Sequence, residues 1–149
     1  MSKQLKNADL FADADWLAWF DGSAKPNPGT CRLACILKGK NGEHFSRSQH
    51  IGYGDSSDAE YQALIAALTL IKQHVNPSQA ESVLLRGDSQ VVIHDVLGPE
   101  AKASARLVEY RQKAQALLSL LPAVRLKWIP RHKNTEVDAL MRNNIDIKN

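Results

Sequence analysis

The sequence predicts one α/β domain in which helices cover a mixed, five-stranded sheet. Strand-like segments come first and follow one another through short turns, and helix-like segments then alternate with two further strands. The size agrees, because 149 residues with 44% hydrophobic content suffice for one domain with a real core. We assign residues 15–146 to this domain and residues 1–14 to an N-terminal tail.

Three strands are predicted at the start of the domain. The apolar run at residues 16–22 is typical of a buried strand. Residues 31–38 form the second strand, and the more polar residues 43–50 form a third at an edge. Residues 39–42 end in Asn-Gly, which is a strong hairpin signal. We therefore expect these three strands to pair in antiparallel fashion.

The rest of the chain alternates helices and strands. Apolar residues at helical spacing predict a long helix over residues 58–74, which the Asn-Pro pair at 76–77 ends. The further elements expected are a strand at 83–86, helices at 89–97 and 101–120, a strand at 124–129 and a short helix from residue 134. A meander followed by such β-α-β units favours a mixed sheet.

Composition and cysteine spacing exclude several classes of protein. No apolar run approaches the ~20 residues of a membrane helix, and the first 15 residues carry three aspartates instead of a signal peptide's basic and apolar segments. We expect a cytoplasmic monomer that binds no membrane. Cys31 and Cys35 would stand roughly 13 Å apart on one strand, too far for a disulfide, so we expect two reduced core thiols.

Charge is unevenly distributed along the chain. Residues 1–101 hold nine basic and twelve acidic residues, a balance of −3, whereas residues 102–149 hold ten and four, a balance of +6. This asymmetry is compatible with a C-terminal half that faces nucleic acid, although from charge alone a solvated helix face is the better explanation. Basic residues spaced along the predicted helix at 101–120 are candidates for such contacts: Lys102, Arg106, Arg111 and Lys113.

Four acidic residues stand at the edges of predicted elements: Asp21, Glu60, Asp88 and Asp138. Each has a local structural explanation. Asp21 can accept hydrogen bonds within its turn, and Asp88 can cap the helix that follows it. Ser57 and Glu60 fit a capping box, as N-cap and third helical residue. Asp138 can be a first-turn acid of a helix capped by Asn134.

Together, however, the four acids indicate a metal site. An ionised aspartate at the end of a buried strand is costly unless it is paired or binds metal. Two Mg²⁺ ions about 3.5–4 Å apart can clamp the attacking and leaving oxygens of a phosphodiester. Because Mg²⁺ prefers carboxylate oxygens and water, acids gathered from separate elements suit such a site. We expect two Mg²⁺ ions, with Mn²⁺ as an alternative.

Four motifs, in order, resemble those of the type 1 ribonuclease H family. They are Phe-Asp-Gly-Ser with Asn-Pro-Gly (20–23 and 27–29), Ala-Glu-Tyr-Gln-Ala-Leu (59–64), Gly-Asp-Ser-Gln (87–90) and Asn-x-x-Val-Asp-Ala-Leu (134–140). One motif alone is weak evidence, but all four together match specifically over about residues 16–142. The resemblance implies a sheet in the order 3-2-1-4-5 with strand 2 antiparallel. It also implies metal-dependent cleavage of RNA in RNA/DNA hybrids, giving 5′-phosphate products.

The resemblance also implies the role of each residue. Asp21 would bridge two metal ions, Glu60 and Asp88 would hold one of them, and Asp138 would help to hold the other. Substrate contacts are expected at eight positions: Ser23, Asn27, Ser56, Ser57, Gln90, Arg131, His132 and Asn134.

The chain departs from the family at two places. Residues 55–57 are Asp-Ser-Ser where Thr-Asn-Asn is usual, so Asp55 stands where a threonine helps to hold a DNA phosphate. Trp128 stands at the position, ten residues before the last acid, of a mobile histidine that assists product release. His132 is a candidate substitute, and Arg131 fits a branch of the family that has a Pro-Arg loop instead.

Three other functions compete with ribonuclease H activity. They are a nuclease of the same fold acting on double-stranded RNA or DNA junctions, a non-catalytic module that binds hybrids, and a structural domain whose acids are all caps. Fold alone does not determine the substrate. The four acids argue against a binding-only module, because negative charge facing phosphates weakens binding.

Overall fold

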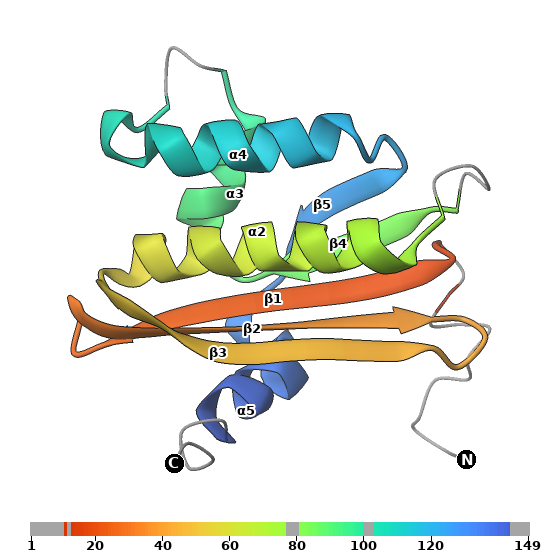
Figure 1. The fold of residues 1–149 in the computed structure, drawn as a ribbon, viewed down its shortest axis with the longest axis horizontal. Coiled ribbons are helices and arrows are strands. Elements are labelled where there is room, and N and C mark those ends of the chain that lie inside the picture. The colour runs from red at the N-terminus through yellow and green to blue at the C-terminus, as the bar shows by residue number, and fades with distance from the viewer. Residues whose placement is uncertain (1–10, 12, 77–80, 100–102, 144–149) are drawn as a thin grey trace.

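A five-stranded mixed sheet forms the centre of the computed structural model, which describes residues 11, 13–76, 81–99 and 103–143 (Figure 1). The strand order is β3-β2-β1-β4-β5. β2 pairs antiparallel with both β1 and β3, whereas β4 runs parallel to β1 and β5. The predicted fold, including the antiparallel second strand, is confirmed.

The first three strands are longer than the sequence predicts. The strands are β1 (Trp16–Lys25), β2 (Gly29–Gly39), β3 (His44–Gly54), β4 (Val83–Gly87) and β5 (Val124–Trp128). The β1–β2 ladder continues as far as the pair Lys25 and Thr30, so Asp21 lies within a strand, opposite Ala34. The expected position of Asp21 at the end of the strand is therefore wrong, because the strand continues to Lys25, and the neighbours of Asp21 in the sheet fix its direction.

The helices lie on both faces of the sheet. They are α2 (Ser56–His74), α3 (Gln90–Leu97), α4 (Val108–Ser119) and α5 (Thr135–Asn143), with the 3-10 turns η3 (Ala105–Leu107) and η4 (Arg131–Lys133). Figure 1 shows α2, α3 and α4 on one face and α5 on the other. None of the helices in the described ranges is long and apolar enough to cross a membrane.

Each face of the sheet has its own hydrophobic core. On the α2 face, alternate residues Trp16, Ala18 and Phe20 pack with buried residues of α2 such as Tyr61 and Leu64. On the α5 face a smaller core consists of Ala34, Ile36, Val137 and Met141. Both faces of β1 and β2 are therefore covered, which explains their nearly continuous apolar sequences.

Part of the helix predicted at residues 101–120 is not helical. The N–H of Ser104 donates to the Asp95 carboxylate at 2.7 Å, and regular α-helix begins only at Val108. Arg111 is buried and donates to the backbone carbonyls of Asp95 and Gly98, so it is unavailable to nucleic acid. Lys102 lies outside the described residues.

Two expectations concern the N-terminal tail and the cysteines. Residues 1–10 and 12 of the expected tail lie outside the described residues, whereas Phe11 and Ala14 pack with Leu17 and Leu84. The cysteines are free and buried, as expected.

Candidate functional site

Three carboxylates from separate elements converge at one edge of the sheet. Asp21 on β1, Glu60 on α2 and Asp88 after β4 each offer one oxygen, and these three oxygens all lie within 4.8 Å of one another. Asp21 and Glu60 are only 6% and 7% exposed, and Asp88 is half-buried. The structure therefore brings together three of the four acids predicted from the sequence.

Gly22 allows β1 to approach the first turns of α2. A Cβ atom at this position would lie 2.3 Å from the Ala59 carbonyl oxygen and 2.7 Å from the Glu60 nitrogen, which no side chain can tolerate. The Gly22 N–H donates to Glu60 Oε1 at 3.1 Å. A glycine directly after Asp21 thus brings the two buried acids together and orients one of them.

The N-terminus of α2 is capped by other residues than those predicted. Asp55 is the N-cap, and its carboxylate accepts from the Asp58 N–H while Asp58 accepts from the Asp55 N–H. The predicted capping box of Ser57 and Glu60 is therefore wrong, because the helix begins two residues earlier and Asp58 takes the N3 position. Glu60 has no capping role and points into the site.

Asp88 is likewise free of the capping role considered for it. Ser89 caps α3 by accepting from the Val92 N–H at 3.2 Å. Asp88 instead accepts from Asn134 Nδ2 at 3.1 Å, and the same amide donates to the Phe20 carbonyl at 3.0 Å.

Asn134 is a positioning residue. It is 1% exposed, so the expected substrate contact is incompatible with the structure, and both its bonds lead into the site instead. Its side-chain oxygen, which would have to accept in a helix cap, has no partner within the described part of the chain. Asn134 therefore links the middle of β1, Asp88 and the start of α5.

Burial and mutual repulsion make the carboxylates difficult to ionise. Burial, reinforced by the charges of Asp88 and Asp138, raises the pKa of Asp21 to about 8. Burial, followed by the charges of Asp21 and Asp88, raises the pKa of Glu60 well above its ordinary value. Arg131 acts in the opposite direction on both pKa values. A cation bound among these acids would relieve the repulsion.

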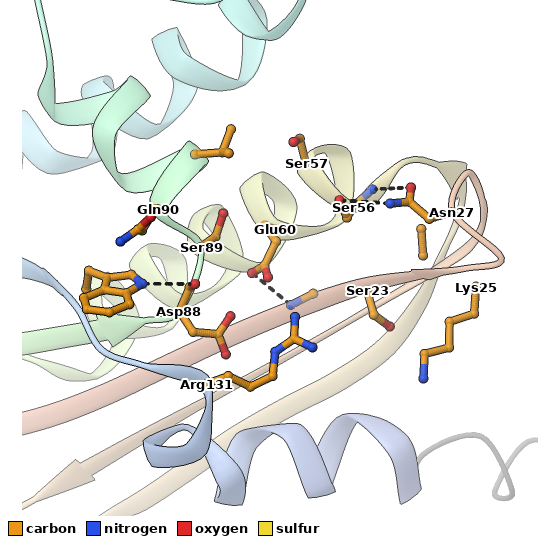
Figure 2. A pocket seen from close by; sticks show the side chains of 14 residues that line it. Ser23, Lys25, Asn27, Ser56, Ser57, Glu60, Asp88, Ser89, Gln90 and Arg131 are labelled. Atoms are coloured by element: carbon orange, nitrogen blue, oxygen red, sulfur yellow. Dashed lines mark hydrogen bonds between the residues drawn. The ribbon is translucent and has the colours of Figure 1, made fainter.

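A groove of about 650 Å³ opens beside these carboxylates (Figure 2). Six of the eight predicted substrate-contact residues line it: Ser23, Asn27, Ser56, Ser57, Gln90 and Arg131. Asn27 and Ser56 bind each other across the groove wall, because the Ser56 N–H donates to Asn27 Oδ1 and Asn27 Nδ2 donates to Ser56 Oγ. The turn between β1 and β2 is thereby fixed to the start of α2.

The chain is similar to known proteins over most of its length. The model of the "Reverse transcriptase-like" family matches residues 19–143. The chain belongs to the type 1 ribonuclease H family. The Ribonuclease HI of Halobacterium salinarum is 32% identical over 130 residues, which are 87% of this chain and 63% of that protein. The chain spans 34% of another relative, a bifunctional protein of Mycobacterium tuberculosis that is 28% identical.

Solved structures of this family superpose closely. The crystal structure of RNase H1 from Halobacterium salinarum gives a TM-score of 0.77 at 29% identity, covering 89% of this chain and 98% of that one. LC11-RNase H1 in complex with an RNA/DNA hybrid gives 0.76 at 25% identity, covering 86% and 94%.

Asp138, the fourth predicted acid of this ribonuclease H-family chain, lies beside the other three. Its charge raises the pKa of Asp21, which places it near that carboxylate, but it is not one of the three whose oxygens lie within 4.8 Å. It also forms an ion pair with Arg142, one helical turn further along α5. Asp138 thus lies close to Asp21 but not within 4.8 Å of all three carboxylates.

Arg131 faces the groove, whereas its neighbour His132 does not. His132 is exposed on η4 and is absent from the groove lining, so the predicted contact of His132 with substrate is not supported. Figure 2 shows the Arg131 side chain extending towards Glu60 and Asp88. Of the two candidates for replacing the family's mobile histidine, the geometry favours Arg131.

Among the groove residues that the sequence analysis did not predict, Lys25 and Trp128 have the largest side chains. Lys25 lines the groove at the end of β1. Because alternate residues of a strand point to the same face, extending the predicted strand beyond Asp21 to Lys25 would have placed Lys25 on the same face as Asp21. Trp128 lines it from the end of β5 and donates from Nε1 to the Asp88 carbonyl at 3.2 Å. No local sequence signal indicates that Trp128 reaches the groove, because its position depends on the parallel pairing of β4 and β5.

Proposed function

We propose that this chain is a metal-dependent endonuclease that hydrolyses the RNA strand of RNA/DNA hybrids and leaves 5′-phosphate ends. The observation that carries the proposal is the convergence of Asp21, Glu60 and Asp88, with oxygens within 4.8 Å, beside an open polar groove. The family and the relatives named Ribonuclease HI and RNase H1 support the same activity, and one of these was solved with an RNA/DNA hybrid.

The acids present the donor set that a hard divalent cation requires. All the candidate ligands are carboxylate oxygens, which suit Mg²⁺ and Mn²⁺. Among the described residues, no lysine, arginine or histidine forms an ion pair with Asp21, Glu60 or Asp88. Buried carboxylates without a cationic partner are costly, and a bound metal would remove that cost.

We infer that two ions bind. Asp21, Glu60 and Asp88 would hold one, and Asp138 with Asp21 would hold the second. When bound, the ions would generate the attacking nucleophile and stabilise charge on the oxygens of the cleaved phosphodiester.

The chain's own groups would orient the site and the substrate. The Gly22 N–H holds one oxygen of Glu60, and Asn134 holds one oxygen of Asp88, so both carboxylates are oriented before substrate binds. The remaining oxygen of Glu60 is available to accept from an RNA 2′-hydroxyl, the group by which a protein distinguishes RNA from DNA. Arg131 and Lys25 supply positive charge towards the phosphates that the carboxylates repel.

A cleavage assay tests this proposal. Labelled RNA/DNA hybrid would be incubated with the protein in Mg²⁺ and in Mn²⁺, beside single-stranded RNA, double-stranded RNA and DNA duplexes, with Asp88→Asn as the control. We expect cutting of the hybrid alone and its loss in the variant. Cutting of another duplex would reassign the substrate, and binding of the hybrid without any cutting would refute the enzyme in favour of a binding module.

A further inference from the structure

Arg32, on β2, is a buried cation for which the described part of the chain provides no ion pair. It is 6% exposed, and its Nη1 is one of three buried side-chain atoms that lack a hydrogen-bond partner in the described part of the chain. No carboxylate among the described residues forms an ion pair with it. A buried charge is strongly destabilising unless it is paired. Arg32 therefore provides the buried cationic group that an anion-binding site requires.

Ser23 stands next to Arg32, and its hydroxyl also has no hydrogen-bond partner among the described residues. The two residues are register partners across β1 and β2, so their side chains leave the same face of the sheet with Cβ atoms roughly 5 Å apart. Ser23 Oγ is another of the three unpartnered atoms, and Ser23 lines the groove. Figure 2 shows Ser23 and Lys25 pointing towards the side on which α5 lies. A guanidinium and a hydroxyl donor side by side suit the oxygens of a phosphate.

The position of this pair relates it to the carboxylates. Ser23 follows Asp21 by two residues on the same strand, so their side chains share a face and lie roughly 7 Å apart. Successive phosphates of one strand are spaced by roughly 3.4 Å along a duplex axis. A nucleic acid held with one phosphate at Asp21 would therefore bring another phosphate, one or two nucleotides away, over Ser23 and Arg32.

We propose that Arg32 and Ser23 bind a phosphate of the substrate strand next to the one that is cleaved. This proposal rests on the proposed function, because it takes the nucleic acid to lie over Asp21. The guanidinium donates N–H bonds to the non-bridging oxygens, and the Ser23 hydroxyl donates one more. Both unpartnered atoms are covered from solvent and Arg32 is not among the residues that line the groove, so binding requires the Arg32 side chain to rotate towards it. The third unpartnered atom, Asn134 Oδ1, belongs to the carboxylate site already described.

Fluorescence anisotropy measures this contact directly. Labelled hybrid would be titrated with the protein, without divalent metal, at a series of salt concentrations. Arg32→Gln should weaken binding about tenfold at low salt, as expected for a lost charge-assisted contact, and should reduce the salt slope by about one. Arg47→Gln is the matched control, because Arg47 is half-buried on β3 opposite Cys35, on the other face. It should change the affinity less than twofold. Unchanged affinity and slope in Arg32→Gln, with normal cleavage by the wild-type chain, would overturn this proposal alone.

Thermal unfolding with inorganic phosphate, at matched ionic strength, gives a reading that does not depend on cleavage. Phosphate should raise the Tm of the wild-type chain and leave that of Arg32→Gln unchanged. A wild-type chain that neither binds nor cuts the hybrid would refute the proposed function, and the phosphate titration would then show separately whether Arg32 binds anions. Equal stabilisation of both chains by phosphate would contradict the anion site.

Two further variants cover the remaining explanations. Asp146→Asn removes the first acidic residue that follows α5 in the sequence. If it lowers the Tm as much as Arg32→Gln while hybrid binding is unaffected by either change, Arg32 pairs with the chain itself and the proposal is wrong. If Arg32→Gln fails to fold, Ser23→Ala provides the test, because it should raise KM with little change in kcat.

Discussion

Acids near the start of helix α2 have two opposite environments: Asp55, its N-cap, and Asp58 are paired, whereas Glu60 belongs with Asp21 and Asp88, which form no ion pair among the described residues. Asp55 and Asp58 at its start form ion pairs with Arg106 at 2.9 and 3.3 Å, and hydrogen bonds to the Asp55 backbone, Tyr110 and Arg106 keep the pKa of Asp58 low despite burial. Glu60, two residues later, has no such cation, and burial raises its pKa. The contrast shows that the acids capping α2 are paired with a cation, whereas Glu60, which belongs to the proposed metal site, forms no ion pair among the described residues.

The largest effect expected is on activity. Asp88→Asn removes a charge of the proposed metal site without altering the cap of α3, so we expect cleavage of the hybrid to fall at least about a thousandfold, a loss of roughly 4 kcal/mol. Far-UV circular dichroism should be unchanged. Asp58→Asn is the paired counterpart and should retain cleavage. If both variants lost activity equally, the distinction between the two groups would be wrong.

A second variant tests how the unpaired acids are held together. Gly22→Ala places a methyl group against the Ala59 carbonyl, so β1 and α2 must separate. We expect a loss of about 1–3 kcal/mol in the free energy of unfolding, together with a loss of cleavage, because Glu60 moves away from Asp21. Denaturant unfolding and the cleavage rate measure the two effects. Wild-type stability would show that this close approach is not required.

The pH dependence of stability should reveal the unpaired acids. The pKa of Asp21 is raised from an ordinary 3.8 to about 8, so the folded chain keeps a proton that the unfolded chain loses. Without metal, this contribution to stability is complete below about pH 4 and is lost as the pH rises to about 8. Thermal unfolding across this range should show the decline. Asp21→Asn should flatten it, and Mg²⁺ should offset it in the wild-type chain only.

The smallest effect is expected from the paired group. Arg106 is 54% exposed, so its ion pairs are screened by solvent. Arg106→Ala should lower the free energy of unfolding by less than about 1 kcal/mol. Cleavage should change less than twofold. A loss as large as that of Gly22→Ala would mean that Arg106 does more than neutralise Asp55 and Asp58.

The sequence predicts the fold and the acids well because both depend on local patterns. The strand order is implied by the resemblance of the four motifs to the type 1 ribonuclease H family, and the acids were selected because each stands at or near the edge of a predicted element. The prediction was less accurate where two local explanations competed. Ser57 and Glu60 fit a capping box as well as Asp55 and Asp58 do, and only the length of β3 and the start of α2 decide between them.

Other features depend on contacts between distant segments. Asn134 is buried because the start of α5 docks against β1 and Asp88. Its two hydrogen-bond partners, Phe20 and Asp88, are 114 and 46 residues away in the sequence. Trp128 joins the groove only because β5 pairs with β4. Arg32 looks like an ordinary polar residue in an alternating strand, and its burial without a partner is visible only in three dimensions. Cytoplasmic location and a monomeric state stay predictions.

Calorimetric titration with Mn²⁺ tests the central claim most directly, because it compares the two groups of acids in one experiment. The account predicts that the wild-type chain and Asp58→Asn bind Mn²⁺ alike, whereas Asp21→Asn does not bind it. Binding that survives in Asp21→Asn, or that is lost in Asp58→Asn, would contradict the assignment of the metal to the unpaired acids.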